Sequence, residues 1–205
     1  MAEADLKAVL RLDATMVEAH ETLAQLYKGQ RMWDLAETHL RGAAALHPKD
    51  PRRVAGLADL LRERRRFDEA IQQYLVAVGI AAQDARLWSG LGLAYQGAGR
   101  VAEALEAFRR AASSDPENAY AQYQLGLANF EARRFDEALT ALRKAALRDP
   151  LRPEVYLALG RLYTAQDDKT QALQAFRRCL RLEPLNTAAR KAVEELSASL
   201  YGAGS

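Results

Sequence analysis

The stretch WSGLGLAYQGAGRVAEALEAFRRAASSDP, residues 88–116, contains one nearly complete unit of a pattern that recurs along the chain. Apolar residues at helical spacing predict two amphipathic helices, one over residues 86–97 and one over residues 101–114. Ala, Leu, Arg, Glu and Gln dominate the composition, and few residues alternate as they do in strands. This stretch therefore predicts a pair of helices within an all-helical chain.

Glycine and proline mark the ends of these two helices. Gly97 and Gly99 predict a tight turn between the helices, because glycine adopts left-handed backbone without steric cost. Asp115-Pro116 ends the second helix, since a residue before proline is steered away from the α region. The unit is thus a helix, a short turn, a second helix and a loop.

The unit repeats every 34 residues. The loop prolines Pro116, Pro150 and Pro184 keep this step, and FDEA occurs at 67–70 and again at 135–138. Three further positions keep the same step: Gly92, Gly126 and Gly160; Leu91, Leu125 and Leu159; Ala104, Ala138 and Ala172.

The glycines of residues 88–100 also raise the question of a nucleotide-binding loop. A dinucleotide loop follows a strand and opens a helix, whereas Gly90-x-Gly92 lies inside a predicted helix. We therefore interpret both glycines structurally. Gly92 is expected to permit close contact between paired helices, and Gly90 to empty part of a surface.

The recurring residues resemble the signature of the tetratricopeptide repeat (TPR) family. The positions that carry the resemblance are Trp88, Leu91, Gly92, Tyr95, Ala104, Phe108 and Pro116. The resemblance covers nearly the whole chain. It implies an all-α fold, a right-handed superhelical solenoid of antiparallel helix pairs.

The expected organisation is five full repeats between two flanking segments. The repeats are 17–50, 51–84, 85–118, 119–152 and 153–186; residues 1–16 are the second helix of a truncated repeat, and residues 187–205 a C-terminal capping helix and tail. Two repeats depart from the signature. Ala58 and Ala82 replace the glycine and proline of the second repeat, and Gln122 and Asn129 replace the tryptophan and tyrosine of the fourth.

Resemblance to TPR arrays implies that first helices line a concave groove, where a partner protein or peptide segment binds. Residues that face away from the core of each first helix are the candidate contacts. These candidates are Arg52, Asp59, Arg86, Ser89, Leu93, Gln96, Tyr120, Tyr123, Gln124, Leu127, Phe130, Leu157 and Arg161.

The C-terminal end of this groove is predicted to be apolar and aromatic. We expect most of the binding energy from Tyr120, Tyr123, Leu127 and Leu157. We expect acidic groups of the partner to bind Arg52, Arg86 and Arg161 and so to set the orientation of the partner segment. The alternative is that the register is shifted by one residue and that some of these side chains belong to the core.

A carboxylate-clamp peptide is not expected as the partner. Many chaperone-linked TPR proteins bind a C-terminal carboxylate with a lysine and an asparagine one turn apart. The matching positions here hold Glu21 with Gln25, Ala55 with Asp59, and Ser89 with Leu93.

The composition argues against nucleic acid and against direct membrane insertion. The 29 basic and 27 acidic residues leave a net charge of only +2. No apolar run is long enough for a membrane-spanning helix. RERRRF, residues 62–67, could attract a phosphate or an acidic partner, but a solvated turn is the simpler interpretation.

No residue pattern predicts catalysis, a cofactor or a metal. His20, His39 and His47 lack the spacing of a helical zinc pair. Cys179 occupies a small core position with no histidine beside it in the repeat, so a nucleophile is not expected. We therefore expect a protein that is not an enzyme.

Two alternatives to a binding scaffold stay open. The helix over residues 3–12 has Leu6, Val9 and Leu10 on a face without its usual partner helix, which could form a homo-oligomer. The chain could instead be a TPR domain excised from a larger enzyme or an envelope or secretion protein, with YGAGS as a native or added tail. The single cysteine is compatible with the cytoplasm, and a cytoplasmic location is favoured for the chain as given, whereas a periplasmic one stays open for an excised domain.

Overall fold

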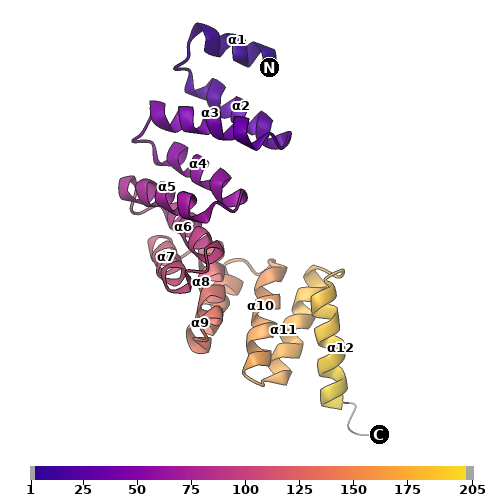
Figure 1. Ribbon diagram of the computed structural model, residues 1–205. Helices are drawn as coiled ribbons and strands as arrows, with labels where there is room; N and C mark the ends of the chain where they lie inside the picture. Colours follow the sequence, from indigo (N-terminus) through magenta and orange to yellow (C-terminus); the bar gives the residue numbers. More distant parts are fainter. Residues whose placement is uncertain (1–2, 202–205) are drawn as a thin grey trace. The chain divides into compact units, whose positions relative to one another are not determined.

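The computed structural model describes residues 3–201, and these residues form helices and connecting turns without any strand (Figure 1). The predicted all-α class, that of a helical repeat solenoid, is confirmed. Residues 1–2 of the first expected segment and residues 202–205 of the tail lie outside the described residues. The helices are α1 Glu3–Leu12, α2 Val17–Gly29, α3 Trp33–Leu46, α4 Pro51–Glu63, α5 Phe67–Ile80, α6 Ala85–Gly97, α7 Val101–Ser114, α8 Ala119–Glu131, α9 Phe135–Arg148, α10 Pro153–Ala165, α11 Lys169–Leu182 and α12 Thr187–Tyr201.

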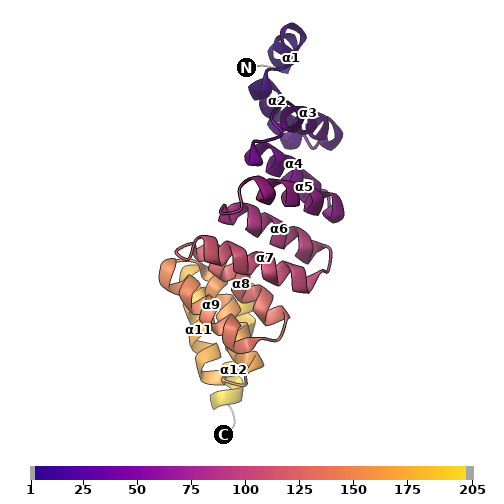
Figure 2. The ribbon, with the colours of Figure 1, turned by 90° about the vertical axis from the view of Figure 1, so that its left-hand side faces the viewer.

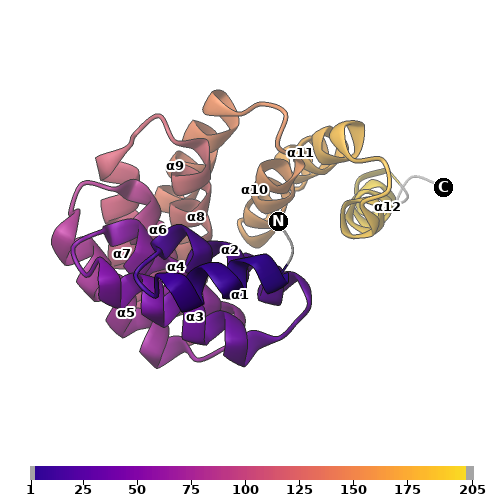
Figure 3. The ribbon, with the colours of Figure 1, turned by 90° about the horizontal axis from the view of Figure 1, so that it is seen from above.

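The chain divides into two compact units, Met1–Arg100 (unit 1) and Val101–Ser205 (unit 2). In unit 1, α2 packs against α3 and α4 against α5, and α3–α4 and α5–α6 contacts join successive pairs (Figure 2). Figure 3 shows α3 and α5 in one row of this unit and α2, α4 and α6 in another. In unit 2, α8 pairs with α9 and α10 with α11, while α7 packs on α8 and α12 on α11.

The turn within each helix pair uses one left-handed residue, and this residue also recurs every 34 positions. Gly99 has φ +75°, as the sequence predicted, but Gly97 belongs to the last turn of α6. A side chain at Gly97 would collide with the Phe67 ring, so this glycine serves close packing rather than turn geometry. The other left-handed residues carry side chains: Arg31 (φ 60°), Arg65 (φ 60°), Arg133 (φ 57°) and Asp167 (φ 58°).

Two glycines of the repeat allow the helices of a pair to approach closely. A Cβ atom at Gly126 would lie 2.6 Å from Cγ of Leu142, and one at Gly160 would lie 2.5 Å from Cε1 of Phe176. Such distances are far inside van der Waals contact. The recurring glycine is therefore required by packing within the helix pair.

A side chain in the first turn of several helices ties the preceding loop to the helix. In each case a side-chain N–H or O–H donates to the carbonyl oxygen six residues earlier. The bonds are Trp88 Nε1 to Ala82 (2.7 Å), Gln122 Nε2 to Pro116 (3.4 Å), Tyr156 Oη to Pro150 (3.1 Å) and an Arg190 guanidinium nitrogen to Pro184 (2.8 Å). The tryptophan position of the signature thus supplies a hydrogen-bond donor as well as a ring.

Candidate functional site

Unit 2 contains a cavity of about 270 Å³ between α8 and α10, which we call the apolar cavity. Five of the predicted groove residues line it: Tyr123, Leu127, Phe130, Leu157 and Arg161. The three residues from α8 are spaced by four and three positions, and the two from α10 by four. Helical periodicity therefore brings each set to one face.

The apolar side chains of this cavity are half-buried and pack against the core of unit 2. Tyr123, Leu127, Phe130 and Leu157 all contact the buried cluster around Leu142 and Leu159. They were predicted to stand outside the stacking core. Instead, each of these side chains lines the cavity and also packs against the core, because neighbouring first helices lie close together.

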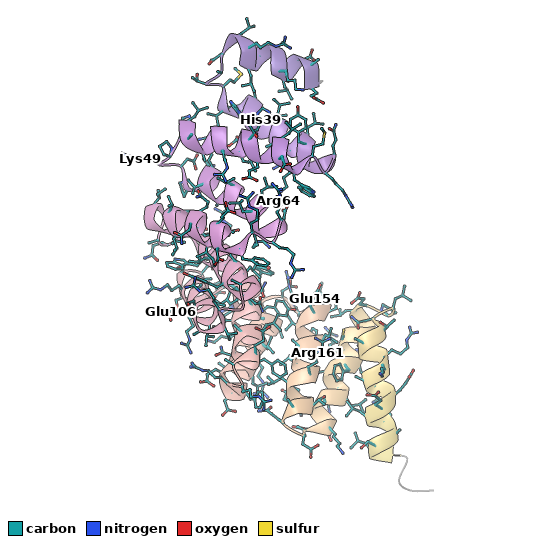
Figure 4. The ribbon with its side chains drawn as sticks, viewed as in Figure 1. His39, Lys49, Arg64, Glu106, Glu154 and Arg161 are labelled. Carbon is teal, nitrogen blue, oxygen red and sulfur yellow. The ribbon has the colours of Figure 1, made fainter. Side chains whose placement is uncertain are left out.

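Two charged residues of α10 also line the apolar cavity. Glu154 and Arg161 both project from α10 (Figure 4). Both line the cavity, and neither forms an ion pair with any of residues 3–201. Burial raises the pKa of the Tyr123 phenol, and the negative charge of Glu154 raises it further. The cavity therefore combines apolar walls with one cation, Arg161, and two carboxylates, Glu131 and Glu154. Among the described residues, Arg161 and Glu154 form no ion pair.

A second cavity, also of about 270 Å³, shares Arg161 with the first. Thr164, Phe176 and Leu196 line it, so it extends the candidate site toward α11 and α12. Sequence reasoning missed these residues. Thr164 could have been found, because it follows Arg161 by three positions on the same helical stripe.

Unit 1 contains a smaller cavity of about 220 Å³, which we call the charged hollow. The predicted residues Arg52, Asp59 and Arg86 line it, together with Tyr74 and Gly90. A side chain at Gly90 would lie 2.5 Å from Cε1 of Tyr74. Gly90 was expected to empty part of a surface; the space it leaves is filled by the Tyr74 ring.

The charges of this hollow are paired within the chain. Asp50 and Asp84 cap α4 and α6 by accepting from backbone N–H groups, and they also bind the guanidinium groups of Arg52 (3.3 Å) and Arg86 (2.9 Å). Tyr74 donates to Asp59 at 2.5 Å. Burial first, and then the charge of Asp59, raise the pKa of this tyrosine.

Four other predicted groove residues line neither the apolar cavity nor the charged hollow. Ser89 and Gln124 are each only 7% exposed, although we expected them to face a partner. Gln124 donates to the Tyr120 hydroxyl at 2.6 Å, which holds the amide inward. Leu93 and Gln96 are half-buried.

Tyr120 also lies outside the apolar cavity, although we expected it to supply binding energy. Its side chain is 40% exposed, and the guanidinium carbon of Arg152 lies 5.8 Å from its ring centroid. This tyrosine is therefore accessible but already engaged by a neighbouring cation.

The arginine-rich turn RERRRF is neutralised by acidic side chains of unit 1. Glu37, which is 8% exposed, binds Arg64 at 2.7 Å and Arg66 at 2.5 Å. Burial acts to raise the pKa of Glu37, but hydrogen bonds from Arg41 and Arg66 outweigh it and lower that pKa. The turn therefore links α3 to α4 and α5, rather than simply lying in solvent.

The first helix is not an open end within unit 1. Leu6 is 1% exposed because α1 packs on α2, and Val9 and Leu10 are half-buried. Tyr27 donates to Glu3 at 2.9 Å. The face that was expected to lack a partner is thus largely covered by α2.

Histidine and cysteine form no metal centre in the described part of the chain, where no three metal-binding side chains gather. His20 and His39 lie with their Nδ1 atoms 3.0 Å apart. Burial lowers the pKa of His39, and the charge of His20 lowers it further. Cys179 is fully buried, and this burial raises the pKa of its thiol.

None of the described helices combines the length and the apolar character that crossing a membrane would require.

The fold resembles that of solved TPR proteins. PilW, a type IV pilus biogenesis factor, has a TM-score of 0.80 at 16% identity, over 93% of this chain and 88% of its own. Pseudomonas aeruginosa pilF has a TM-score of 0.78 at 21% sequence identity, and the match covers 93% of this chain and 86% of pilF. YrrB, a TPR protein with an unusual peptide-binding site, has a TM-score of 0.72 at 17% sequence identity, and the match covers 94% of this chain and 100% of YrrB. At such identities the likeness shows the fold.

Sequence comparison identifies the family of the chain. No curated protein sequence matches the chain. Two models of the tetratricopeptide repeat do match it, one at residues 89–153 and 130–187 and the other at residues 29–93. Together they cover most of the chain, including α4 and α6, which line the charged hollow, and α8 and α10, which line the apolar cavity. The chain belongs to the tetratricopeptide repeat family.

Proposed function

We propose that the protein is a non-catalytic scaffold that binds a segment of a partner protein in the apolar cavity of unit 2. TPR proteins typically act as protein-interaction scaffolds. The observation that carries the proposal is the gathering of Tyr123, Leu127, Phe130 and Leu157 around one cavity. Half-buried aromatic and aliphatic side chains in a concave site are the usual anchors of protein recognition.

The charges of the cavity define the partner segment further. Arg161 is exposed and without an ion pair among the described residues, so its guanidinium could donate hydrogen bonds to a carboxylate of the partner. Glu154 would accept a hydrogen-bond donor or a cation. The proposed segment therefore presents an apolar side chain to the cavity, with an acidic group within reach of Arg161.

The charged hollow of unit 1 contributes less in this proposal. Its guanidinium groups already bind the capping carboxylates Asp50 and Asp84, and a partner would have to compete with those pairs. Both guanidinium groups are also highly exposed, so an ion pair that they formed with a partner would itself add little binding energy. We therefore place Arg52 and Arg86 at the periphery of the site.

The test compares variants of the cavity with a matched variant of unit 1. The double variant Tyr123→Ala and Leu127→Ala removes two anchors, whereas Leu93→Ala changes the residue that precedes Leu127 by one repeat. Tagged protein is used to capture partners from the lysate of the source organism. We expect the double variant to lose the partner and Leu93→Ala to keep it.

A photo-crosslinking amino acid at Leu157 then locates the contact. The account predicts a crosslink between this position and a partner that the double variant fails to capture. Circular dichroism shows whether the double variant stays folded. Equal capture by a folded double variant and the unmodified protein would refute the proposal.

A further inference from the structure

A third cavity of unit 2 lies on a different face of α8, between α7, α8 and α9. Its volume is about 350 Å³, and we call it the polar pocket. From α8 it is lined by Gln122, Leu125 and Asn129, whereas Tyr123 and Leu127 of the same helix face the apolar cavity. The two cavities therefore use separate sets of side chains.

The polar pocket occupies the place of two aromatic rings. Gln122 and Asn129 stand in the positions that hold Trp88 and Tyr95 one repeat earlier, and Tyr156 and Tyr163 one repeat later. Both amides are buried, at 4% and 2% exposure. Gln122 keeps the loop hydrogen bond of this position, to Pro116 at 3.4 Å, but leaves the volume of the ring open.

Asn129 presents an unpaired acceptor to this pocket. Its Nδ2 donates to the Leu125 carbonyl at 3.0 Å, and its Oδ1 accepts no hydrogen bond although it is buried. The orientation of the amide is set by the bond to Leu125, because the reverse orientation would bring two oxygens together. A buried acceptor without a donor is costly, so a ligand or a water that donates to this atom would be favoured.

The rim of the pocket carries opposite charges at opposite ends. Asn129 is near the end of α8, and the short turn that follows brings it beside Asp136 and Glu137 in the first turn of α9. Gln122 is in the first turn of α8, near the second half of α7 with Arg109 and opposite Lys144 of the antiparallel α9. The pocket thus has an acceptor end and a cationic end.

The four charged side chains are available to a ligand. Neither Arg109 nor Lys144, and neither Asp136 nor Glu137, forms an ion pair with another residue between Glu3 and Tyr201. Arg109 is half-buried and the other three are exposed. This differs from the charged hollow of unit 1, where each guanidinium already has a carboxylate.

We infer that the polar pocket binds a small linear zwitterion of the basic amino-acid class. Its cationic end would donate to Asn129 Oδ1 beside Asp136 and Glu137, and its carboxylate would lie toward Arg109 and Lys144. Seven residues separate Gln122 from Asn129, which corresponds to about 10 Å along the helix. Lysine, arginine and 6-aminohexanoate each carry a terminal cation and a carboxylate several bonds apart. Lysine and arginine also carry an α-ammonium beside the carboxylate, whereas 6-aminohexanoate has only the two charged ends.

The binding experiment compares two-ended with one-ended probes. The ¹⁵N-labelled protein is titrated with L-lysine, L-arginine and 6-aminohexanoate, and separately with hexylamine and hexanoate. We expect shifts of α8 and α9 resonances for a two-ended probe, with each one-ended probe binding about tenfold more weakly. Equal binding of hexylamine, or no response to any two-ended probe, would overturn the inference.

Two variants locate the site. Asn129→Tyr with Gln122→Trp restores the aromatic residues of the neighbouring repeats and is expected to abolish binding. Arg109→Ala with Lys144→Ala changes only the rim, so it keeps the test valid if the first variant does not fold, and about fivefold weaker binding is expected. Binding that survives in both variants would place the ligand elsewhere.

A third variant separates this inference from the proposed function. Leu127→Ala alters the apolar cavity and should leave lysine binding unchanged. A peptide ending in lysine carries the same two charges; tighter binding of that peptide than of free lysine would overturn the assignment to a free ligand. A water on Asn129 Oδ1 that no probe displaces would show that the pocket holds solvent alone.

Discussion

The charged hollow of unit 1 and the apolar cavity of unit 2 are built at the same positions of the repeat, yet they differ in what they leave available. In the hollow, Arg52 and Arg86 are tied to helix-capping aspartates, and the Tyr74 ring fills the space beside Gly90. In the apolar cavity, Tyr123 and Leu157 line open space, and Arg161 has no ion pair within the described residues. The repeat sets where these side chains lie. The residues that form no ion pair within the chain determine where a partner can bind favourably.

The largest expected effect concerns the packing that shapes the hollow. Gly90→Gln places in unit 1 the residue that unit 2 carries 34 positions later, at Gln124. The new Cβ would lie 2.5 Å from the Tyr74 ring, so we expect unit 1 to lose about 1–3 kcal/mol of stability. Native-state hydrogen exchange of α5 and α6 measures this loss.

Gly56→Ala is the matched control for that variant. A Cβ at Gly56 would lie 3.7 Å from Cδ2 of Leu40, which is ordinary contact. We expect no loss, and a gain of about 0.5–1 kcal/mol from the higher helix propensity of alanine. Similar losses at both glycines would show that the Tyr74 contact is not what distinguishes the hollow.

The next effect tests the paired and unpaired arginines. Arg161→Ala should weaken binding of the captured partner by about fivefold, because its charge has no partner within the described chain. Arg86→Ala should change the affinity by less than about twofold, since Asp84 already binds that guanidinium. Titration calorimetry with the partner segment measures both, and the reverse order would contradict the comparison.

A smaller effect is expected at the turns, which the two units share. Arg65 in unit 1 and Arg133 in unit 2 hold the left-handed conformation that Gly99 adopts at the same position. Glycine removes the steric cost of a Cβ there, so Arg65→Gly and Arg133→Gly should each stabilise their unit by about 0.5–1 kcal/mol. Alanine at either position should give no such gain, and urea unfolding compares the variants.

The smallest effect is a difference in pH dependence between the units. All three histidines lie in unit 1, and the pKa of His39 is lowered by burial and by His20. A lowered pKa in the folded state means that stability is complete above the unfolded value near 6.5 and falls as the pH drops below it.

Hydrogen exchange at pH 7.5 and pH 5.5 measures this difference in each unit. Both pH values lie above the pKa values of ordinary carboxylates. We expect protection of α2 and α3 to fall at the lower pH, and protection of α10 and α11 to stay the same. His39→Gln should remove the change, and a pH effect that persists in this variant would show a different origin.

The helices were predictable from local patterns. The predictions over residues 86–97 and 101–114 differ by at most one residue from α6 and α7, because apolar spacing, Gly99 and Asp115-Pro116 act within a few residues of one another. The family resemblance extended that pattern along the chain. Local signals of this kind are readable without knowing any tertiary contact.

Part of the candidate site was predictable for the same reason. Helical spacing placed Tyr123, Leu127 and Phe130 on one face, and all three line the apolar cavity. Spacing gives the direction of a side chain but not the space in front of it. Ser89 and Gln124 point along similar stripes, yet their neighbours bury them.

The remaining features depend on contacts between distant residues. Glu37 neutralises Arg64 and Arg66 across 27 and 29 positions, which no local pattern predicts. Gln122 and Asn129 were recognised as departures from the repeat. Their consequence, an open pocket with an unpaired acceptor, follows only from how α7, α8 and α9 pack around them.

The most direct test of the central claim measures the affinity of one captured partner for two double variants. Tyr123→Ala with Leu127→Ala removes apolar anchors from unit 2, and Arg52→Ala with Arg86→Ala removes the paired cations from unit 1. The account predicts that the first double variant binds about 10–100-fold more weakly and the second within about threefold of the unmodified protein. A larger loss in the second double variant would contradict the claim that binding energy resides in the apolar cavity.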